Sequence, residues 1–115
     1  MTREFVFMPE FEMQWKKLKF NDLDLRDVEV LLCNNPSAGP VMKGTGGLRK
    51  LRWARPGNKG KSGGCRILYV DFDAFEKIYM VTCFSKNKQV NLEAKQKQLV
   101  KGVIDRIKAE LRGKS

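Results

Sequence analysis

The chain has 115 residues, which is enough for one domain with a single compact core. Hydrophobic residues make up 42% of it and charged residues 31%, a composition that excludes a disordered or membrane-embedded chain. Its 23 lysines and arginines outnumber its 13 acidic residues, and the resulting net charge of +10 indicates a polyanionic partner.

The chain contains no histidine, which excludes serine–histidine and cysteine–histidine catalysis and imidazole metal sites. Its three cysteines, Cys33, Cys65 and Cys83, fit neither a disulfide framework nor a CxxC zinc motif. Cys83 lies in an apolar run, where a small core residue is expected and not a nucleophile. We expect no metal and no cofactor, so any catalysis must use lysine, arginine, tyrosine, serine, threonine or carboxylates.

Apolar runs are much shorter than the roughly 20 residues that a membrane span requires. Glu4, Glu10 and Glu12 also interrupt the apolar residues near the start, where a secretory signal would be continuous. We therefore expect a cytoplasmic protein without a membrane partner.

A strand and a first helix are predicted at the N-terminus. Residues 3–7 (REFVF) have the composition of a strand, and Pro9 suits the first turn of a helix. The apolar residues of this helix recur at intervals of four and three, which places them on one face: Phe11, Trp15 and Leu18.

A second helix follows, and either Asn21 or Asp22 can cap its N-terminus. Its buried stripe is predicted from the helical spacing of four apolar residues: Leu25, Val28, Leu31 and Leu32. The helix ends at residues 34–36, because the residue before Pro36 disfavours the helical conformation. The two helices together form a hairpin.

The second half of the chain predicts strands and a final helix. Residues 36–47 contain too many prolines and glycines for a regular element. Three segments have the composition of strands: residues 48–54, 65–72 and 77–86. A basic, glycine-rich loop at residues 55–64 joins the first two as an antiparallel pair, and a turn at residues 71–76 leads to the third. Asn91 can cap a C-terminal helix, whose apolar stripe is Leu99, Val100, Val103, Ile104, Ile107 and Leu111.

The predicted order is β-α-α-β-β-β-α, in a single domain that spans residues 1–115. We expect an α+β fold, with a small and mainly antiparallel sheet and with helices packed mainly on one side. The other face of the sheet is expected to be partly open, and basic residues would be usable there.

Positive charge concentrates in the segment from position 43 to position 66, which has no acidic residue. Its cations are Lys43, Arg49, Lys50, Arg52, Arg55, Lys59, Lys61 and Arg66. Because a strand alternates its faces with a period of two, Lys50 and Arg52 point to one side. Leu51 and Trp53 point to the opposite side. The alternative is a solvated surface strand, but uncompensated cations at this density repel each other.

If the strands pair in sequence order, five basic residues converge on one patch: Lys50, Arg52, Arg66, Lys86 and Lys88. The glycines of the loop, together with Lys59 and Lys61, suit a phosphate-binding rim, and a flexible turn is the alternative. Such a patch can cleave RNA by a metal-independent route, because the 2′-hydroxyl of RNA is itself the nucleophile. Arginine neutralises the charge on the reacting phosphate, and lysine supplies a point charge or a proton. Composition alone supports nucleic-acid binding, and cleavage is a further inference.

Three segments resemble the RelE superfamily of bacterial toxins, and most of all its HigB-like branch. They are GTGGLRKLR at residues 44–52, GKSGGCRILY at residues 60–69, and the pair of residues 78–79 followed by Ser85, Lys86 and Asn87. The resemblance spans about residues 40–95, and members of the superfamily have the same order of helices and strands.

The resemblance implies the toxin of a type II toxin–antitoxin system, an endoribonuclease that cleaves mRNA in the ribosomal A site and so inhibits translation. It implies a HigA-like helix-turn-helix antitoxin as the partner that holds the toxin inactive. Arg66 would contact the scissile phosphate, and Lys50, Arg52 and Lys86 would be the other catalytic residues. The expected RNA-binding residues are Arg49, Lys59, Lys61 and Lys88.

Some members of the superfamily use a tyrosine near the start of the last helix, where this chain has Leu92 and Glu93. That role is either empty or taken by Tyr69 or Tyr79, so the general base stays open. Two other functions also stay open: a ParE-like toxin that inhibits gyrase, and a nucleic-acid-binding module without catalysis. The cationic face favours the nuclease, because a gyrase inhibitor needs no cluster that neutralises phosphate.

Overall fold

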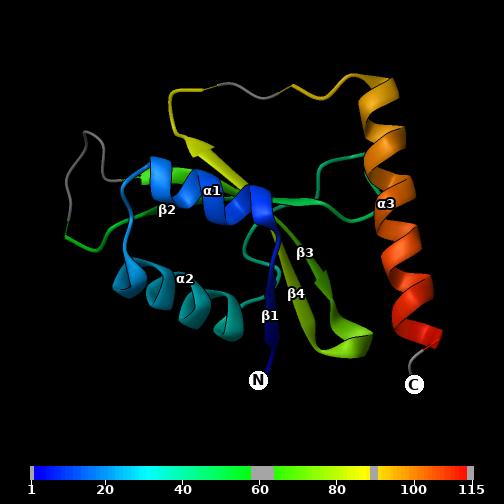
Figure 1. Ribbon diagram of the computed structural model, residues 1–115, viewed down its shortest axis with the longest axis horizontal. Coiled ribbons are helices and arrows are strands. Elements are labelled where there is room, and N and C mark those ends of the chain that lie inside the picture. The colour runs from blue at the N-terminus through cyan, green and yellow to red at the C-terminus, as the bar shows by residue number, and fades with distance from the viewer. Residues whose placement is uncertain (1, 58–63, 89–90, 114–115) are drawn as a thin grey trace.

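The computed structural model describes residues 2–57, 64–88 and 91–113. Within these residues the helices and strands follow one another in the predicted order (Figure 1). The strands are β1 (Glu4–Phe7), β2 (Arg49–Ala54), β3 (Gly64–Phe72) and β4 (Lys77–Ser85). The helices are α1 (Pro9–Lys17), α2 (Asp22–Asn34) and α3 (Ala94–Gly113), and a 3₁₀ turn, η1 (Asp73–Phe75), connects β3 to β4. The predicted α+β fold class is confirmed.

In the described part of the chain, four strands form one mixed sheet in the order β1-β4-β3-β2. Strands β2, β3 and β4 pair antiparallel in sequence order, as predicted. Strand β1 runs parallel to β4, with Glu4 opposite Lys77, and an ion pair of 2.6 Å joins these two side chains. A parallel neighbour needs a long connection, here the helical hairpin and the two following strands. Local sequence patterns therefore do not predict that β1 pairs with β4.

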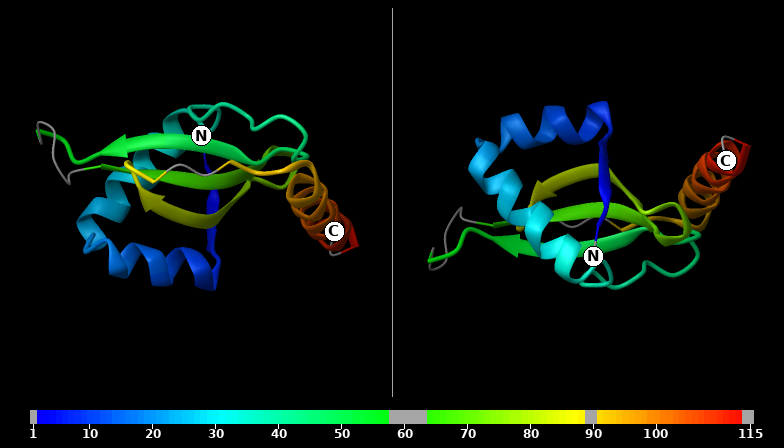
Figure 2. Two further views of the ribbon diagram at one scale, coloured as in Figure 1. Left: turned by 90° about the horizontal axis from the view of Figure 1, so that it is seen from above. Right: turned by 90° about the horizontal axis from the view of Figure 1, so that it is seen from below.

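Apolar side chains pack on both faces of the sheet. The first core lies under α1 and α2 and contains Phe11, Trp15, Phe20, Val28, Leu32, Leu51, Trp53, Cys65, Ile67, Tyr69, Ile78, Met80 and Cys83. The second core involves α3 and contains Leu48, Leu68, Val70, Phe72, Phe84, Ile104 and Leu111. The strands separate the helical hairpin from α3 (Figure 2). Helices α1 and α2 thus share one face, whereas α3 covers part of the face that we expected to be open.

Strand β2 has the predicted alternation of faces. Leu51 and Trp53 are buried in the first core, and Arg52 between them is exposed. The indole Nε1 of Trp53 donates a hydrogen bond of 2.8 Å to Oδ2 of Asp27 on α2, and its ring packs against Trp15. Because buried indole N–H groups need a partner, this bond defines which face of β2 lies under the helices.

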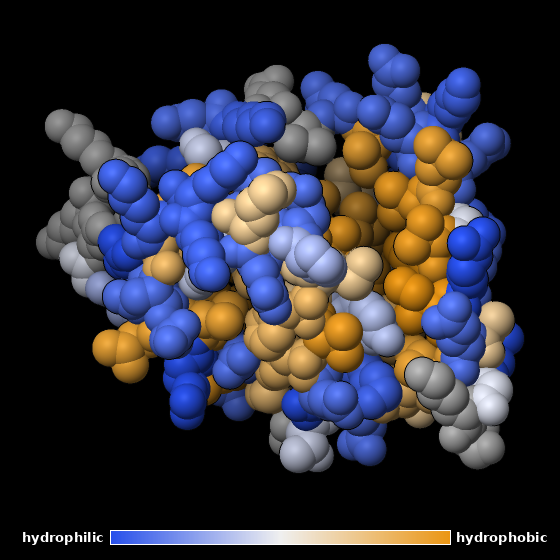
Figure 3. All heavy atoms as spheres, viewed as in Figure 1, coloured by the Kyte–Doolittle hydropathy of each residue, from blue (hydrophilic) through white to orange (hydrophobic). Residues whose placement is uncertain are grey.

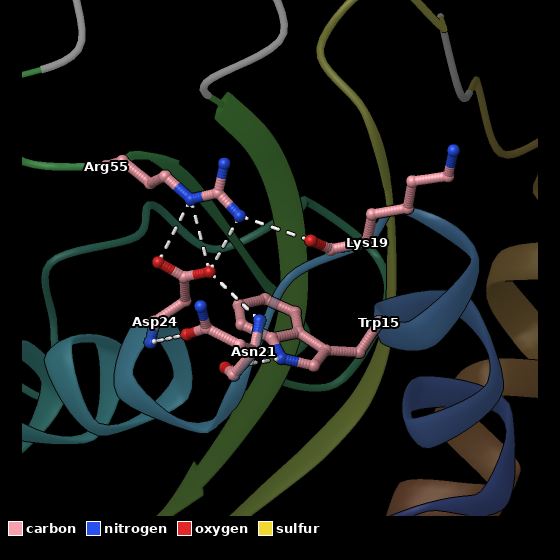
Figure 4. A network of polar contacts seen from close by, with 5 residues as sticks. All are labelled: Trp15, Lys19, Asn21, Asp24 and Arg55. Carbon is pink, nitrogen blue, oxygen red and sulfur yellow. Dashed lines mark hydrogen bonds and ion pairs between the residues drawn. The ribbon is translucent and has the colours of Figure 1, made fainter.

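A polar network joins the start of α2 to the end of β2 (Figure 4). Asn21 caps α2: its Oδ1 accepts a hydrogen bond of 2.8 Å from the amide of Asp24, and the carboxylate of Asp24 accepts one of 2.9 Å from the amide of Asn21. This is a capping box, and it selects Asn21 over Asp22 as the cap. Arg55, which follows β2 directly, donates from Nε and Nη2 to the same carboxylate at 2.9–3.1 Å. The end of β2 is therefore tied to the helical hairpin.

The network also affects the ionisation of Asp24. Hydrogen bonds from the Arg55 guanidinium lower the pKa of Asp24, burial opposes this effect, and the Asn21 amide lowers the pKa further. The ionised carboxylate is thus the form that the fold prefers.

The boundaries of α3 differ from the prediction. Asn91 does not cap this helix, which begins at Ala94. The amide of Glu93 donates to Oε1 of Gln96 at 2.9 Å, and the carbonyl of Glu93 accepts the amide of Lys97. A side chain inside the first turn thus satisfies the free amide before the helix, which removes the need for Asn91. No helix within the described segments has the length and apolar character to span a bilayer.

We expect Asp24→Asn to destabilise the protein by about 1 kcal/mol at neutral pH, the usual effect of losing a capping interaction. The fold lowers the pKa of Asp24 from its ordinary value of 3.8, so ionised Asp24 stabilises the protein at pH values above 3.8. This contribution is lost as the pH falls below 3.8 and the carboxylate becomes protonated. In urea unfolding at a series of pH values, the difference between wild type and variant should be largest near neutrality and shrink below about pH 4.

Asp22→Asn is the matched control, because Asp22 is exposed in the first turn of the same helix. Equal destabilisation by the two substitutions at every pH would show that the network contributes nothing of its own.

Candidate functional site

A pocket of about 340 Å³ lies where the end of β2, the start of β3 and the segment after β4 meet. Three cationic side chains line it, Arg52 from β2, Arg66 from β3 and Lys86 from the turn after β4. No acidic side chain of the described residues lines it. We call it the basic pocket. Three of the four predicted catalytic residues are thus brought together from segments that are distant in the sequence.

The sheet register places the two arginines of the basic pocket directly opposite each other. Arg52 pairs with Arg66 across the antiparallel strands β2 and β3. Like charges at opposed positions destabilise a sheet, and the ion pairs of the described residues include neither arginine. Two guanidinium groups that form no ion pair with the described residues suit an anion, because an anion bound between them would offset their repulsion.

Arg66 also organises the third side of the pocket. Its Nη1 donates a hydrogen bond of 2.5 Å to the backbone carbonyl of Lys86. The amide of Asn87 donates to Oγ of Ser85 at 3.2 Å, which closes the turn after β4. The arginine on the strand therefore holds in place the turn that carries the third cation.

Lys50 lies in a neighbouring pocket and not in the basic pocket. This second pocket also has a volume of about 340 Å³, and Lys50 from β2, Lys43 from the preceding loop and Lys97 from α3 line it. We call it the lysine pocket. Lys97 was absent from the sequence-based candidates, since nothing in its helical context marks it. The signal that leads to it is the glycine motif at residues 44–47, which lies close to α3.

The other predicted RNA-binding residues do not join the basic pocket. Arg49 lies on the opposite side of β2 from Arg52, and its Nη1 donates a hydrogen bond of 2.8 Å to the carbonyl of Gly39. Lys88 lines a small separate cavity together with residues of α1. Lys59 and Lys61 lie outside the described residues.

Neither candidate tyrosine lines the basic pocket. Tyr69 is fully buried on the helix-covered face, where its hydroxyl donates to the carbonyl of Pro36 at 2.7 Å and accepts from the amide of Gly39 at 2.9 Å. Burial raises the pKa of Tyr69. Tyr79 packs in the second core, with its ring 5.1 Å from that of Phe72. Tyr69 is therefore a structural residue that fixes the loop before β2, and neither tyrosine lies at the basic pocket.

The cysteines near the site are core residues. Cys65 and Cys83 are each 1% exposed, which confirms the prediction for Cys83. Burial is the main cause that raises the pKa of each thiol to about 12, so both are protonated at neutral pH. No group of three potential metal ligands occurs among the residues that the structure describes.

A third pocket, of about 260 Å³, is entirely apolar and lies between α3 and the sheet. Its rim includes Leu99 and Val103, which are 66% and 52% exposed, and Figure 3 shows apolar surface along the inner side of α3. No charged residue of the described part of the chain lines this pocket, so it is unsuited to a phosphate. Charged residues line the two cationic pockets instead.

Comparison with known proteins relates the whole architecture to a solved structure. No protein-family model matches the chain. The structure is similar to that of a double arginine-to-alanine mutant of the E. coli toxin RelE in the free state, with a TM-score of 0.54 and 15% identity. The match covers 76% of this chain and 86% of RelE. The chain has the fold of RelE. The RelE-like fold that the sequence motifs predicted is thus confirmed, and the HigB-like branch stays a prediction.

We expect thiol labelling to separate the cysteines of this RelE-like domain. With iodoacetamide at about pH 8, Cys33 should react in the native protein, because it is partly exposed, while Cys65 and Cys83 stay unmodified. Mass spectrometry of peptides labelled with and without denaturant measures this. Rapid labelling of Cys65 in the native state would contradict the burial that the structure assigns to it.

We expect Arg52→Thr to stabilise the fold slightly, by about 0.5 kcal/mol, because it removes one of two opposed cations and introduces a good strand former. The same substitution should reduce the rise in melting temperature that inorganic phosphate causes, measured against sodium chloride at equal ionic strength. Equal phosphate effects in both proteins would show that the arginine pair is no anion site.

Proposed function

We propose that this protein is the toxin of a type II toxin–antitoxin system and that it cleaves mRNA on the ribosome. The observation that carries the proposal is the basic pocket, which is lined by Arg52, Arg66 and Lys86 and in which the two arginines lie directly opposite each other on adjacent strands. The fold supports it, because a solved structure that shares this fold is that of a protein named as a toxin. The net charge of +10 suits an RNA-rich target.

In the proposed reaction the RNA supplies its own nucleophile. The 2′-hydroxyl oxygen attacks the adjacent phosphorus in line, the bond from phosphorus to the 5′-oxygen breaks, and a 2′,3′-cyclic phosphate remains. The guanidinium groups of Arg52 and Arg66 bind the non-bridging oxygens, whose negative charge increases in the transition state. Such stabilisation needs no metal, although it leaves two proton transfers to be made, one from the 2′-hydroxyl and one to the 5′-oxygen.

We assign proton donation to the leaving 5′-oxygen to Lys86. Apart from the arginines, the titratable residues that line the described part of the basic pocket are Lys86 and Cys65. Cys65 is buried and cannot reach the substrate, which leaves Lys86 as the proton donor. The backbone of Lys86 is fixed by Arg66, so the ammonium group is presented from a defined turn. Arg66 thereby serves both the phosphate and the placement of the proton donor.

The proposal includes two macromolecular partners in the cytoplasm. The ribosome would present the mRNA in its A site, and a HigA-like helix-turn-helix antitoxin would hold the toxin inactive until growth arrest is needed. An antitoxin segment with an acidic surface would complement the excess of basic side chains. The HigB-like assignment within the superfamily rests on the sequence motifs.

We expect Arg66→Ala to lower mRNA cleavage by at least about 100-fold, the usual effect of removing one preorganised charge-stabilising group. Induced expression of the wild-type chain in a bacterium without antitoxin should stop growth. Primer extension on a translated message should then show new 5′ ends inside codons, and both effects should be lost in the variant.

Arg26→Ala is the matched control, since Arg26 is an exposed arginine on α2, away from the basic pocket. It should cleave as the wild type does. Growth arrest without new 5′ ends would overturn the nuclease in favour of a gyrase inhibitor, and normal growth with a folded protein would leave a nucleic-acid-binding module.

A further inference from the structure

We propose that the lysine pocket binds a second phosphate of the same RNA strand, next to the phosphate that is cleaved. The proposal rests on the proposed function for the nature of the strand. It assigns Lys50 to the neighbouring phosphate and not to the scissile one, and it adds Lys43 and Lys97 to the substrate-binding residues.

The lysine pocket gathers cations from three separate segments. Lys43 comes from the glycine-rich loop, Lys50 from β2 and Lys97 from the start of α3, and no acidic side chain of the described residues lines the pocket. None of the three forms an ion pair with the part of the chain that the structure describes. Repulsion between the three lysines destabilises the free protein. With an anion bound among them, their net electrostatic interaction would become favourable.

The position of Lys97 on its helix adds to this argument. The first turn of α3 contains no acidic residue, although the N-terminus of a helix favours negative charge. A lysine close to this end opposes the helix dipole, whereas Glu93, which directly precedes the helix, favours it. A phosphate in the pocket would be attracted by Lys97 and by the partial positive charge of the helix start.

The glycine motif at residues 44–47 brings Lys97 to the pocket. Gly44 and Gly46 have φ values of +83° and +79°, and a Cβ at Gly46 would lie 3.0 Å from Cγ of Lys101 on α3. A Cβ at Gly44 would lie 3.4 Å from Cδ of Lys97. Between them the hydroxyl of buried Thr45 donates to the carbonyl of Met42 at 2.6 Å and accepts from the amide of Leu48 at 3.0 Å. The turn is thus built to let α3 approach, with the stem of Lys97 beside it.

The two cationic pockets follow one another along β2. Arg52 lines the basic pocket, Lys50 lines the lysine pocket, and the two side chains lie on the same face of the strand. Two residues of an extended strand span about 6.6 Å, which is comparable to the distance between successive phosphates of single-stranded RNA. An RNA strand that runs along β2, with its scissile phosphate between Arg52 and Arg66, therefore places a neighbouring phosphate at the lysine pocket.

The test is binding of a hexaribonucleotide with 2′-O-methyl groups, which cannot be cleaved because its 2′-oxygens are blocked. Fluorescence anisotropy with the full chain, at several sodium chloride concentrations, gives the affinity and its salt dependence. We expect Lys97→Ala to bind about fivefold more weakly at low salt, with a log–log salt slope smaller by about 0.7, the value for one lost contact to single-stranded RNA. Lys97→Arg should bind as the wild type does, because it keeps the charge.

Lys95→Ala is the matched control, since Lys95 is an exposed lysine of the same helix turn that does not line the pocket. Equal binding by Lys97→Ala and Lys95→Ala, with both variants folded, would overturn the second phosphate site. Cleavage of a translated message separates the two proposals. If the wild type produces no new 5′ ends on a translated message while Lys97→Ala still weakens RNA binding, the nuclease fails and the phosphate site stands.

Discussion

The burial of Leu51 and Trp53 beneath the helical hairpin is the constraint on which the rest of the structure depends. Both side chains belong to the first core, and the hydrogen bond from Trp53 to Asp27 selects one orientation of β2. Since strand residues alternate between faces, Arg52 must then lie on the other side of the sheet. A shift of one residue in the register of β2 would bury Arg52 and expose Trp53. The burial of Trp53 and the exposure of Arg52 therefore depend on the same register.

The pairing of β2 with β3 turns this local requirement into a site. Arg52 and Arg66 lie opposite each other, and the fold tolerates their repulsion because β3 is buried on both faces by large apolar side chains. The network of Arg55, Asp24 and Asn21 ties down the strand end next to the pocket (Figure 4). The backbone that carries the pair of arginines is thus held by contacts outside the pocket, which limits how far it moves when an anion binds.

The glycine motif at residues 44–47 shapes its own turn and also determines how closely α3 approaches it. Its turns have positive φ values, and its buried threonine makes the turn rigid through two hydrogen bonds. The same compactness lets α3 approach the loop, which sets Lys97 near Lys43 and Lys50. The apolar pocket on the inner side of α3 lies beyond these lysines along the helix, so cationic and apolar surfaces follow one another on the face that α3 shares with the sheet.

The sequence by itself determined the order of the elements, the α+β class and the faces of β2, because these follow from helical and strand periodicity over a few neighbouring residues. It also singled out Arg52, Arg66 and Lys86 through motifs within single segments. Only the tertiary structure decided which residues meet. Tyr69 is engaged by a distant loop, and Lys50 joins Lys97 and not Arg66, because strand register and helix docking depend on contacts between residues far apart in the chain. The parallel pairing of β1 with β4 has the same origin, since it joins the two ends of the sheet-forming chain through contacts that no local pattern encodes.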